Sequence, residues 1–246
     1  MRFTLHLEGA MRTAQAAGSR SATAADAVAL HAWLASRHAA FDGLTKAIVH
    51  TPVAEGVSDP YHGREASPDC VLQLYFSELD GLERSCRTEG PVAELLLAMA
   101  SHTCADYDWT QQTMAARSFA VSETDVCLAA ADARPHCTYL VGYPGPADDL
   151  HLWLRHYIDH HPPIMAKFPG IREAEIFTRV DSPNTLGVQR ADLMQRNKVV
   201  FDDPAALHRA LASEIRHEMR EDGLRFPPFA GGSSHYPMAS VARRYA

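Results

Sequence analysis

The stretch WLRHYIDHHPPIMAKFPGI, residues 153–171, places three histidines, a tyrosine and an aspartate within six residues, ahead of two prolines and a Pro-Gly turn. The residues before the prolines fit an amphipathic helix, which we expect Pro162, Pro163 and the Pro169-Gly170 turn to end. Its expected core contacts are Leu150, Leu152, Leu154, Tyr157 and Ile158. So many titratable groups near a helix end indicate a metal site, a proton-transfer site or a solvated face rich in histidine.

The second half of the chain, taken outward from this stretch, predicts four strands and two helices. Residues 136–143, 171–181 and 192–202 have strand patterns, and the first helix begins near Asp148. The second helix begins near Asp203 and Pro204, because proline suits a first helical position. Residues 234–244 predict a last strand, in which Pro237 indicates an edge or bulge position. The order β-α-β-β-α-β is that of a ferredoxin-like unit.

The first half repeats this order, which indicates a duplication. The sequence His31-Ala-Trp33-Leu34 of the first half is similar to His151-Leu-Trp153-Leu154 of the second. We therefore expect one unit over residues 1–124, a second over residues 125–246, and a linker at about 122–135. One such unit leaves a sheet face uncovered, so two can pack their open faces together. The predicted fold class is α+β: two tandem ferredoxin-like units that form an intramolecular dimeric α+β barrel around a shared cavity.

The stretch 153–171 resembles the EthD-like branch of the dimeric α+β barrel superfamily, in which a helix ends in His-x-Pro before a Leu/Phe-Pro-Gly turn. Its best-matching histidine is His161, directly before Pro162. More narrowly, the tandem layout with MQRNKVVFD, SEIRHEM and GGSSHYPMAS is similar to the methylesterase and cis-trans isomerase proteins of bacterial lignin-aromatic (syringate) catabolism. This resemblance implies a small-molecule enzyme that hydrolyses a methyl ester of a ring-cleavage dienoate, or isomerises its double bond.

Composition excludes several classes of partner. The net charge of −7 argues against binding to nucleic acid or to an anionic membrane surface. No segment has the length and apolarity of a transmembrane helix or a signal peptide, and five scattered cysteines without a C-x-x-C pair fit buried thiols and a cytoplasmic protein. We expect a small anionic molecule as substrate. A homodimer is possible, although a tandem barrel needs no partner to close.

The metal interpretation lacks ligands, so we predict no metal site. His156 and His160 share a helix face, but Asp159 lies on a neighbouring face and no third ligand is apparent. Proton transfer is the stronger hypothesis, because histidine titrates near neutral pH. We rank His161 first and His160 second as general acid/base, with the other histidine solvated. Tyr157 is a candidate hydrogen-bond donor to a substrate oxygen, or a partly buried tyrosine without a role.

Strand parity provides candidate anion ligands. In residues 171–181, Glu173, Glu175, Phe177 and Arg179 share the face expected to line the shared cavity, and the alternate residues face the helices. Arg179, Arg196 and Lys198 could each hold a substrate carboxylate, and Arg179 could instead pair with a glutamate. We add His217 as an oxyanion-stabilising or catalytic candidate. His50, at a strand end, and His62, in a loop that could overhang the cavity, complete the substrate-binding candidates.

Two observations limit the reaction. The chain has no G-x-S-x-G elbow, phosphate loop or dinucleotide fingerprint, and nothing in it indicates flavin or haem, so we predict no cofactor. An esterase of this sequence would use histidine-activated water or an enol-assisted route. The alternatives are a lactone isomerase, a polyketide-cyclase-like proton-transfer enzyme, and a non-catalytic small-molecule binding or accessory protein on the same fold.

Overall fold

The computed structural model describes residues 2–12, 21–53, 57–62, 67–103, 107–121 and 134–245. Most of the predicted linker, and the boundary at residues 124 and 125, lie outside these residues. The elements in chain order are β1 (Arg2–Met11), α1 (Ala24–Arg37), the 3₁₀ turn η1 (His38–Ala40), β2 (Leu44–Pro52), β3 (Cys70–Phe76), α2 (Leu79–Ser85), α3 (Pro91–Thr103), β4 (Tyr107–Phe119), β5 (His136–Tyr143), α4 (Leu150–Met165), β6 (Glu173–Arg179), β7 (Gln189–Arg190), β8 (Gln195–Phe201), α5 (Pro204–Leu211), α6 (Glu214–Gly223) and β9 (Ser234–Arg244).

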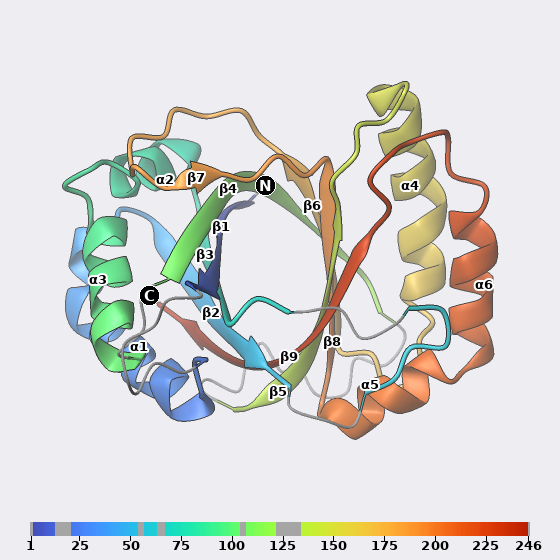
Figure 1. The fold of residues 1–246 in the computed structure, drawn as a ribbon, viewed down its shortest axis with the longest axis horizontal. Coiled ribbons are helices and arrows are strands. Elements are labelled where there is room, and N and C mark those ends of the chain that lie inside the picture. Colours follow the sequence, from blue (N-terminus) through green and yellow to red (C-terminus); the bar gives the residue numbers. More distant parts are fainter. Residues whose placement is uncertain are drawn as a thin grey trace.

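Two β-α-β-β-α-β units form one closed barrel, which confirms the predicted fold class. Within the described residues the antiparallel strand order is β1-β3-β2-β9-β5-β8-β6-β4, and β4 pairs back with β1. Each unit supplies four neighbouring strands in the ferredoxin-like order. The units join at β2–β9 and at β4–β6, so at each junction the second β-strand of one unit pairs with the last strand of the other. Figure 1 shows the barrel viewed into its interior, and both chain ends lie on the side formed by the N-terminal unit.

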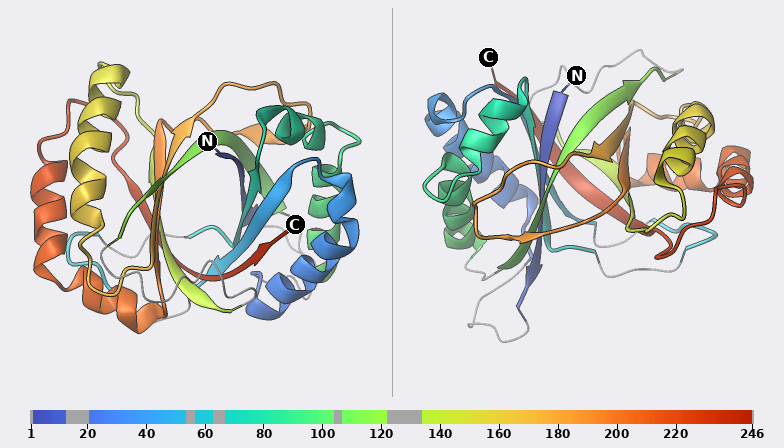
Figure 2. Two further views of the ribbon diagram at one scale, coloured as in Figure 1. Left: turned by 180° about the vertical axis from the view of Figure 1, so that it is seen from behind. Right: turned by 90° about the horizontal axis from the view of Figure 1, so that it is seen from above.

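The helices cover the outside of the barrel in two separate layers. Helices α1, α2 and α3 lie on one side and α4, α5 and α6 on the other (Figures 1 and 2). Each layer packs its own hydrophobic core against the sheet, with Leu30, Leu34 and Leu95 in the first, and Trp153 and Tyr157 in the second. None of the helices in the described part of the chain is long and apolar enough to cross a membrane.

The inside of the barrel is packed with buried polar and charged side chains. Lys198, which has no exposed surface, places Nζ 2.9 Å from Glu173, 2.8 Å from Glu175 and 3.0 Å from the hydroxyl of Tyr75. Lys46 lies 3.4 Å from Glu173 and 3.9 Å from Glu175. A lysine buried this completely requires such carboxylate partners, because an unpaired charge in the interior is costly. The predicted strand parity is correct: Phe177 packs inside the barrel, and Ala174 and Ile176 pack under the helices.

Helix boundaries differ from the sequence predictions at prolines and at one serine. Helix α4 does not end at Pro162 but runs to Met165, because proline lacks only the backbone donor, and the Pro162 carbonyl still accepts a hydrogen bond from the Ala166 amide. Gly170, with φ of 75°, then reverses the chain. The predicted second helix is two helices, α5 and α6, because Ala212 and Ser213 interrupt the helix between them. Among the expected core contacts of α4, Leu152 is exposed, and Trp153 is buried.

Pro237 lies in a central strand, although at its own position only one neighbouring strand is paired. Strand β9 lies between β2 and β5 and is therefore central in the barrel. Its pairing with β2 begins at Met238, whereas Pro237 pairs only with Tyr139 of β5. Proline is tolerated there because no second strand needs an amide hydrogen from it.

Candidate functional site

A cavity of about 200 Å³ lies between the outer face of the sheet and helices α4 and α6, outside the barrel. Strands β5, β8 and β9 form its floor, and the end of α4, helix α6 and the chain after it form its walls. The lining is largely aromatic and aliphatic, as in small-molecule sites. Its polar members include His161, Asn197, Arg216, Arg220 and Ser233. The sequence prediction placed the cavity inside the barrel; this cavity occupies the opposite face of the same strands.

His161 stands in the wall of this cavity and is held by a carboxylate. It is on the last turn of α4, 5% exposed, and its Nδ1 lies 2.7 Å from Oδ2 of Asp222 on α6. The rings of Tyr157 and Phe226 pack against the imidazole, at centroid distances of 4.9 and 5.0 Å. The imidazole is therefore held by two aromatic contacts and by a hydrogen bond at one nitrogen, as a positioned acid/base requires.

The protonation state of the pair follows from its surroundings. Burial lowers the pKa of His161, and the hydrogen bond to Asp222 offsets this only in part. Burial raises the pKa of Asp222, but the hydrogen bond with His161 and the electrostatic influence of the three nearby imidazoles outweigh it, and the net pKa is below the ordinary value. At neutral pH an ionised Asp222 can only accept, so Nδ1 of a neutral His161 carries the hydrogen. Its Nε2 lone pair has no hydrogen-bond partner among the described residues and is free to take a proton.

A chain of hydrogen bonds leads to a second polar group of the cavity, Tyr143. Asn197 Nδ2 donates to the Tyr157 hydroxyl at 2.6 Å. Because the Tyr157 hydroxyl accepts from Asn197, its own hydrogen is available for the hydrogen bond that it shares with the Tyr143 hydroxyl. Tyr143 lines the cavity, and its own hydroxyl hydrogen is then available to donate to a ligand. Burial is the largest influence on the pKa of both tyrosines and raises it, so both stay protonated at neutral pH.

A segment of the N-terminal unit covers the cavity, and we call residues 57–62 the strap. Oδ1 and Oδ2 of Asp59 each accept a hydrogen bond of 3.0 Å from Arg216 of α6, and Oδ2 also accepts one of 2.7 Å from the Tyr139 hydroxyl. The Tyr61 hydroxyl hydrogen-bonds to Nδ1 of His217. The strap is the cyan segment beside α5 and α6 in Figure 1. The cavity is thus built by both units.

Two further groups stand at the cavity. His62 of the strap stacks on His235 of β9, with ring centroids 3.7 Å apart. Burial lowers the pKa of His235 to about 3, so this imidazole is neutral. Arg220 is exposed, and its guanidinium lies 4.4 Å from the centroid of the Tyr61 ring. Because no salt bridge of Arg220 occurs within the described residues, its charge can serve an anionic ligand.

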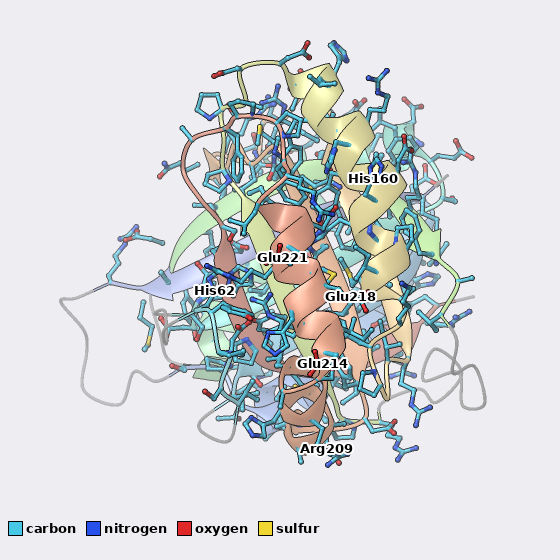
Figure 3. The ribbon with its side chains drawn as sticks, turned by 90° about the vertical axis from the view of Figure 1, so that its right-hand side faces the viewer. His62, His160, Arg209, Glu214, Glu218 and Glu221 are labelled. Atoms are coloured by element: carbon cyan, nitrogen blue, oxygen red, sulfur yellow. The ribbon has the colours of Figure 1, made fainter. Side chains whose placement is uncertain are left out.

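Four of the predicted site residues belong to this region, at different depths. His161 and His62 line the cavity; Tyr157 is fully buried one hydrogen bond behind Tyr143 and does not line it. His217 is exposed and contacts the site through Tyr61. His160 points away: it is exposed, stacks on His156 and has its Nδ1 2.8 Å from the carbonyl oxygen of His156. Figure 3 shows His160 and His62 on opposite sides of α6.

The remaining candidates lie away from the cavity. Arg196 is buried inside the barrel and bonds to Glu8 and Gln112. His50 is fully buried there, between Ser240 and Gln73, at 2.7 and 3.2 Å. Lys198 is in the buried cluster described above. Arg179 is partly exposed and forms a salt bridge of 2.7 Å with Asp192. This is the predicted alternative to substrate binding, with an aspartate in place of the expected glutamate. None of these four side chains lines the cavity.

Sequence reasoning missed Asp222, Tyr143, Arg216, Asp59 and Arg220. Asp222 is 61 residues from His161 and lies in REDG, an ordinary charged helix end. Tyr143 could have been found, because it continues the outward face of Tyr139 and Val141 on β5. Among the described residues, no three His, Cys, Asp or Glu side chains gather as a metal site would require.

Comparison with known proteins places the fold. No family model matches the chain, and no curated protein sequence matches it. The crystal structure of an anthrone oxidase-like protein aligns at 13% identity over 99% of this chain and 92% of its own, with a TM-score of 0.55. A provisionally assigned monooxygenase from Lactobacillus acidophilus aligns at 10% identity over 99% and 96%, with a TM-score of 0.53. An EthD-family protein from Bacillus halodurans aligns with 40% of this chain and 96% of its own at 20% identity, with a TM-score of 0.33, too low to support an argument. The full-length likenesses show a shared fold.

Proposed function

We propose that this protein is a small-molecule enzyme in which His161 acts as general acid/base on a planar, conjugated carboxylic acid or its methyl ester. The observation that carries the proposal is the His161–Asp222 pair in the wall of the cavity, with a 2.7 Å hydrogen bond on one ring nitrogen and the other nitrogen free. An imidazole oriented by a buried carboxylate is a standard arrangement for proton transfer.

The same groups support either reaction of a ring-cleavage dienoate. In isomerisation, Nε2 of His161 removes a proton from a carbon that is conjugated with a carbonyl group. The negative charge then moves onto the carbonyl oxygen. The former double bond gains single-bond character and rotates, and the imidazolium then returns the proton. In ester hydrolysis, Nε2 deprotonates a water that attacks the ester carbonyl, and the imidazolium protonates the departing methoxide to give methanol. In both cases the Tyr143 hydroxyl would donate to the developing oxyanion.

The lining of the cavity fits such a substrate. Flat aromatic side chains, including Tyr139, Phe226 and Phe229, suit a planar conjugated chain. Arg220 at the mouth offers a guanidinium without a carboxylate partner in the described part of the chain, and Arg216 offers one that is already paired with Asp59. We therefore assign Arg220 to the substrate carboxylate.

The test is turnover of a panel of ring-cleavage dienoates and their methyl esters, followed by ultraviolet absorbance and mass spectrometry. Loss of a methyl group identifies hydrolysis, and an absorbance change at constant mass identifies isomerisation. His161→Gln serves as the inactive reference, and His151→Gln, an exposed histidine on the same helix, as the matched control. If no member is converted by the wild-type protein, the dienoate assignment is wrong.

A second candidate reaction is oxidation of an enolisable aromatic compound by molecular oxygen. It is favoured by the descriptions of the full-length structural neighbours, an anthrone oxidase-like protein and a provisionally assigned monooxygenase. It would begin with the same deprotonation by His161. Oxygen uptake with anthrone as substrate, measured by an oxygen electrode, separates it from isomerisation and hydrolysis, which consume none.

A further inference from the structure

His156 is a partly buried histidine that the proposed reaction does not use. It lies beside the same carboxylate as His161. Its Nε2 lies 3.6 Å from Oδ1 of Asp222, and Oδ2 of that carboxylate lies 2.7 Å from His161. This nitrogen is buried and has no hydrogen-bond partner in the described residues. Asp222 therefore stands between two imidazoles that come from one helix.

The three groups run from the cavity to the surface. The His161 side chain is 7% exposed and the Asp222 side chain 6%, whereas that of His156 is 22% exposed. The ring of His156 stacks on that of His160, which is exposed, with centroids 4.5 Å apart. The ring of Phe226 packs against both His156 and His161, at 5.7 and 5.0 Å, and so covers one side of the array.

We propose that His156 and Asp222 form a proton outlet, through which the buried His161 exchanges its proton with solvent at the exposed part of the His156 side chain, outside the cavity. The inference rests on the proposed function of His161. A substrate that fills the cavity displaces water from Nε2 of His161, so the base then has no aqueous contact on that side. His156 acts on the substrate only through Asp222 and His161, and is a positioning residue.

The proton steps balance without a co-reactant. In ester hydrolysis the new carboxylic acid loses its proton to Nε2 of His161, and Nδ1 then passes its own proton to Oδ2 of Asp222. Rotation about the Cβ–Cγ bond of Asp222 turns the carboxylic acid toward His156, whose Nε2 accepts the proton. His156 then releases its Nδ1 proton to water, and Asp222 is again a carboxylate. The net result is one proton moved from the cavity to solvent.

The experiment needs no substrate, so its failure is distinct from failure of the proposed function. The Nδ1 proton of His161, held by Asp222, gives a low-field NMR resonance, assigned by its loss in His161→Gln. Its exchange with water is measured by saturation transfer at fixed pH. In His156→Gln, whose amide keeps a polar group beside Asp222 but cannot relay a proton, we expect exchange to slow by about a hundredfold, the lower end of what a positioned acid/base group contributes. His151→Gln is the control.

Three outcomes decide the proposal. An unchanged exchange rate in His156→Gln overturns it. Loss of the low-field resonance in that variant also overturns it, because His156 would then hold Asp222 in place and carry no proton. Slower exchange at an unshifted resonance supports it, and so does recovery of the rate in His156→Ala when free imidazole is added. The His151→Ala protein should show no such recovery beyond the general effect of the buffer.

Discussion

At the scale of single residues, the decisive feature is how little separates a buried histidine from an exposed one. His160 and His161 are adjacent, yet one is solvated and the other stands in the cavity wall against Asp222. The sequence motif ranked His161 first, because it directly precedes Pro162. It could not find Asp222, because only the packing of α6 on α4 brings that carboxylate near.

Asp222→Asn tests the carboxylate while keeping the shape of the side chain. The amide can offer its NH₂ to Nδ1, which stabilises the wrong tautomer of His161 and moves the hydrogen to Nε2. We expect kcat/KM to fall by roughly 10²–10⁴-fold, as for loss of a general base or its orienting group. Steady-state kinetics on the converted substrate measure the effect, with circular dichroism as the check on folding. Activity within a few-fold of wild type would contradict the assignment.

At the scale of elements, strand parity was predictable and the face used by the cavity was not. The alternation in residues 171–181 correctly separated Ala174 and Ile176 from Phe177, and the polar residues beside Phe177 suggested a polar cavity. Inside a closed barrel, however, those charges pair with one another across strands from both units. The cavity formed instead under α4 and α6, where the alternate residues of β5 and β8 point.

Lys198→Met tests whether the buried lysine supports structure. Removal of its charge leaves the fully buried Glu175 with a partly exposed Arg2 at 3.0 Å and Lys46 at 3.9 Å, so we expect the free energy of unfolding to fall by about 3 kcal/mol, the lower end for a broken buried ion pair. Urea denaturation measures this. Because Lys198 faces away from the cavity, kcat/KM of the folded variant should stay near that of wild type. Unchanged stability together with lost activity would return Lys198 to the substrate-binding candidates.

Asp59→Asn tests the strap. This variant replaces the paired carboxylate of Arg216 with a neutral amide and loosens residues 57–62 over the cavity. Because the strap forms the wall and not the acid/base pair, we expect KM to rise more than kcat falls. Ser58→Ala, in the same segment, is a mild control. A fall in kcat at constant KM would place the strap in the chemical step.

At the scale of the whole molecule, the repeated unit explains the closed barrel, and the differences between the two units explain why the aromatic cavity lies beside the C-terminal one. The repeated strand order could be seen in the sequence, and it predicted the barrel. The difference between the units could not, because it depends on what each inter-strand loop carries. The strap brings Asp59, Tyr61 and His62 to the C-terminal unit, whereas the loop before β7 inserts Leu186 into the core of the N-terminal unit. Figure 2 shows that loop crossing the barrel toward α2.

The buried histidines predict how stability depends on pH. Burial is the largest influence on the pKa of His6, His50 and His161, and each is lowered in the folded protein. The unfolded chain therefore binds more protons below about pH 6.5, the ordinary histidine pKa, so the free energy of unfolding should decrease as pH falls from there. Urea denaturation at pH 8, 6.5 and 5.5 measures this. Constant stability over that range would show that these histidines are not held neutral.

The central claim is that His161, and not its neighbour, is the acid/base of the cavity. The most direct measurement compares kcat/KM of His161→Gln and His160→Gln on the same converted substrate, with both proteins verified as folded. We predict a loss of roughly 10²–10⁴-fold for the His161 variant and little change for the His160 variant. Comparable activity in the two variants, or a greater loss in His160→Gln, would contradict the account.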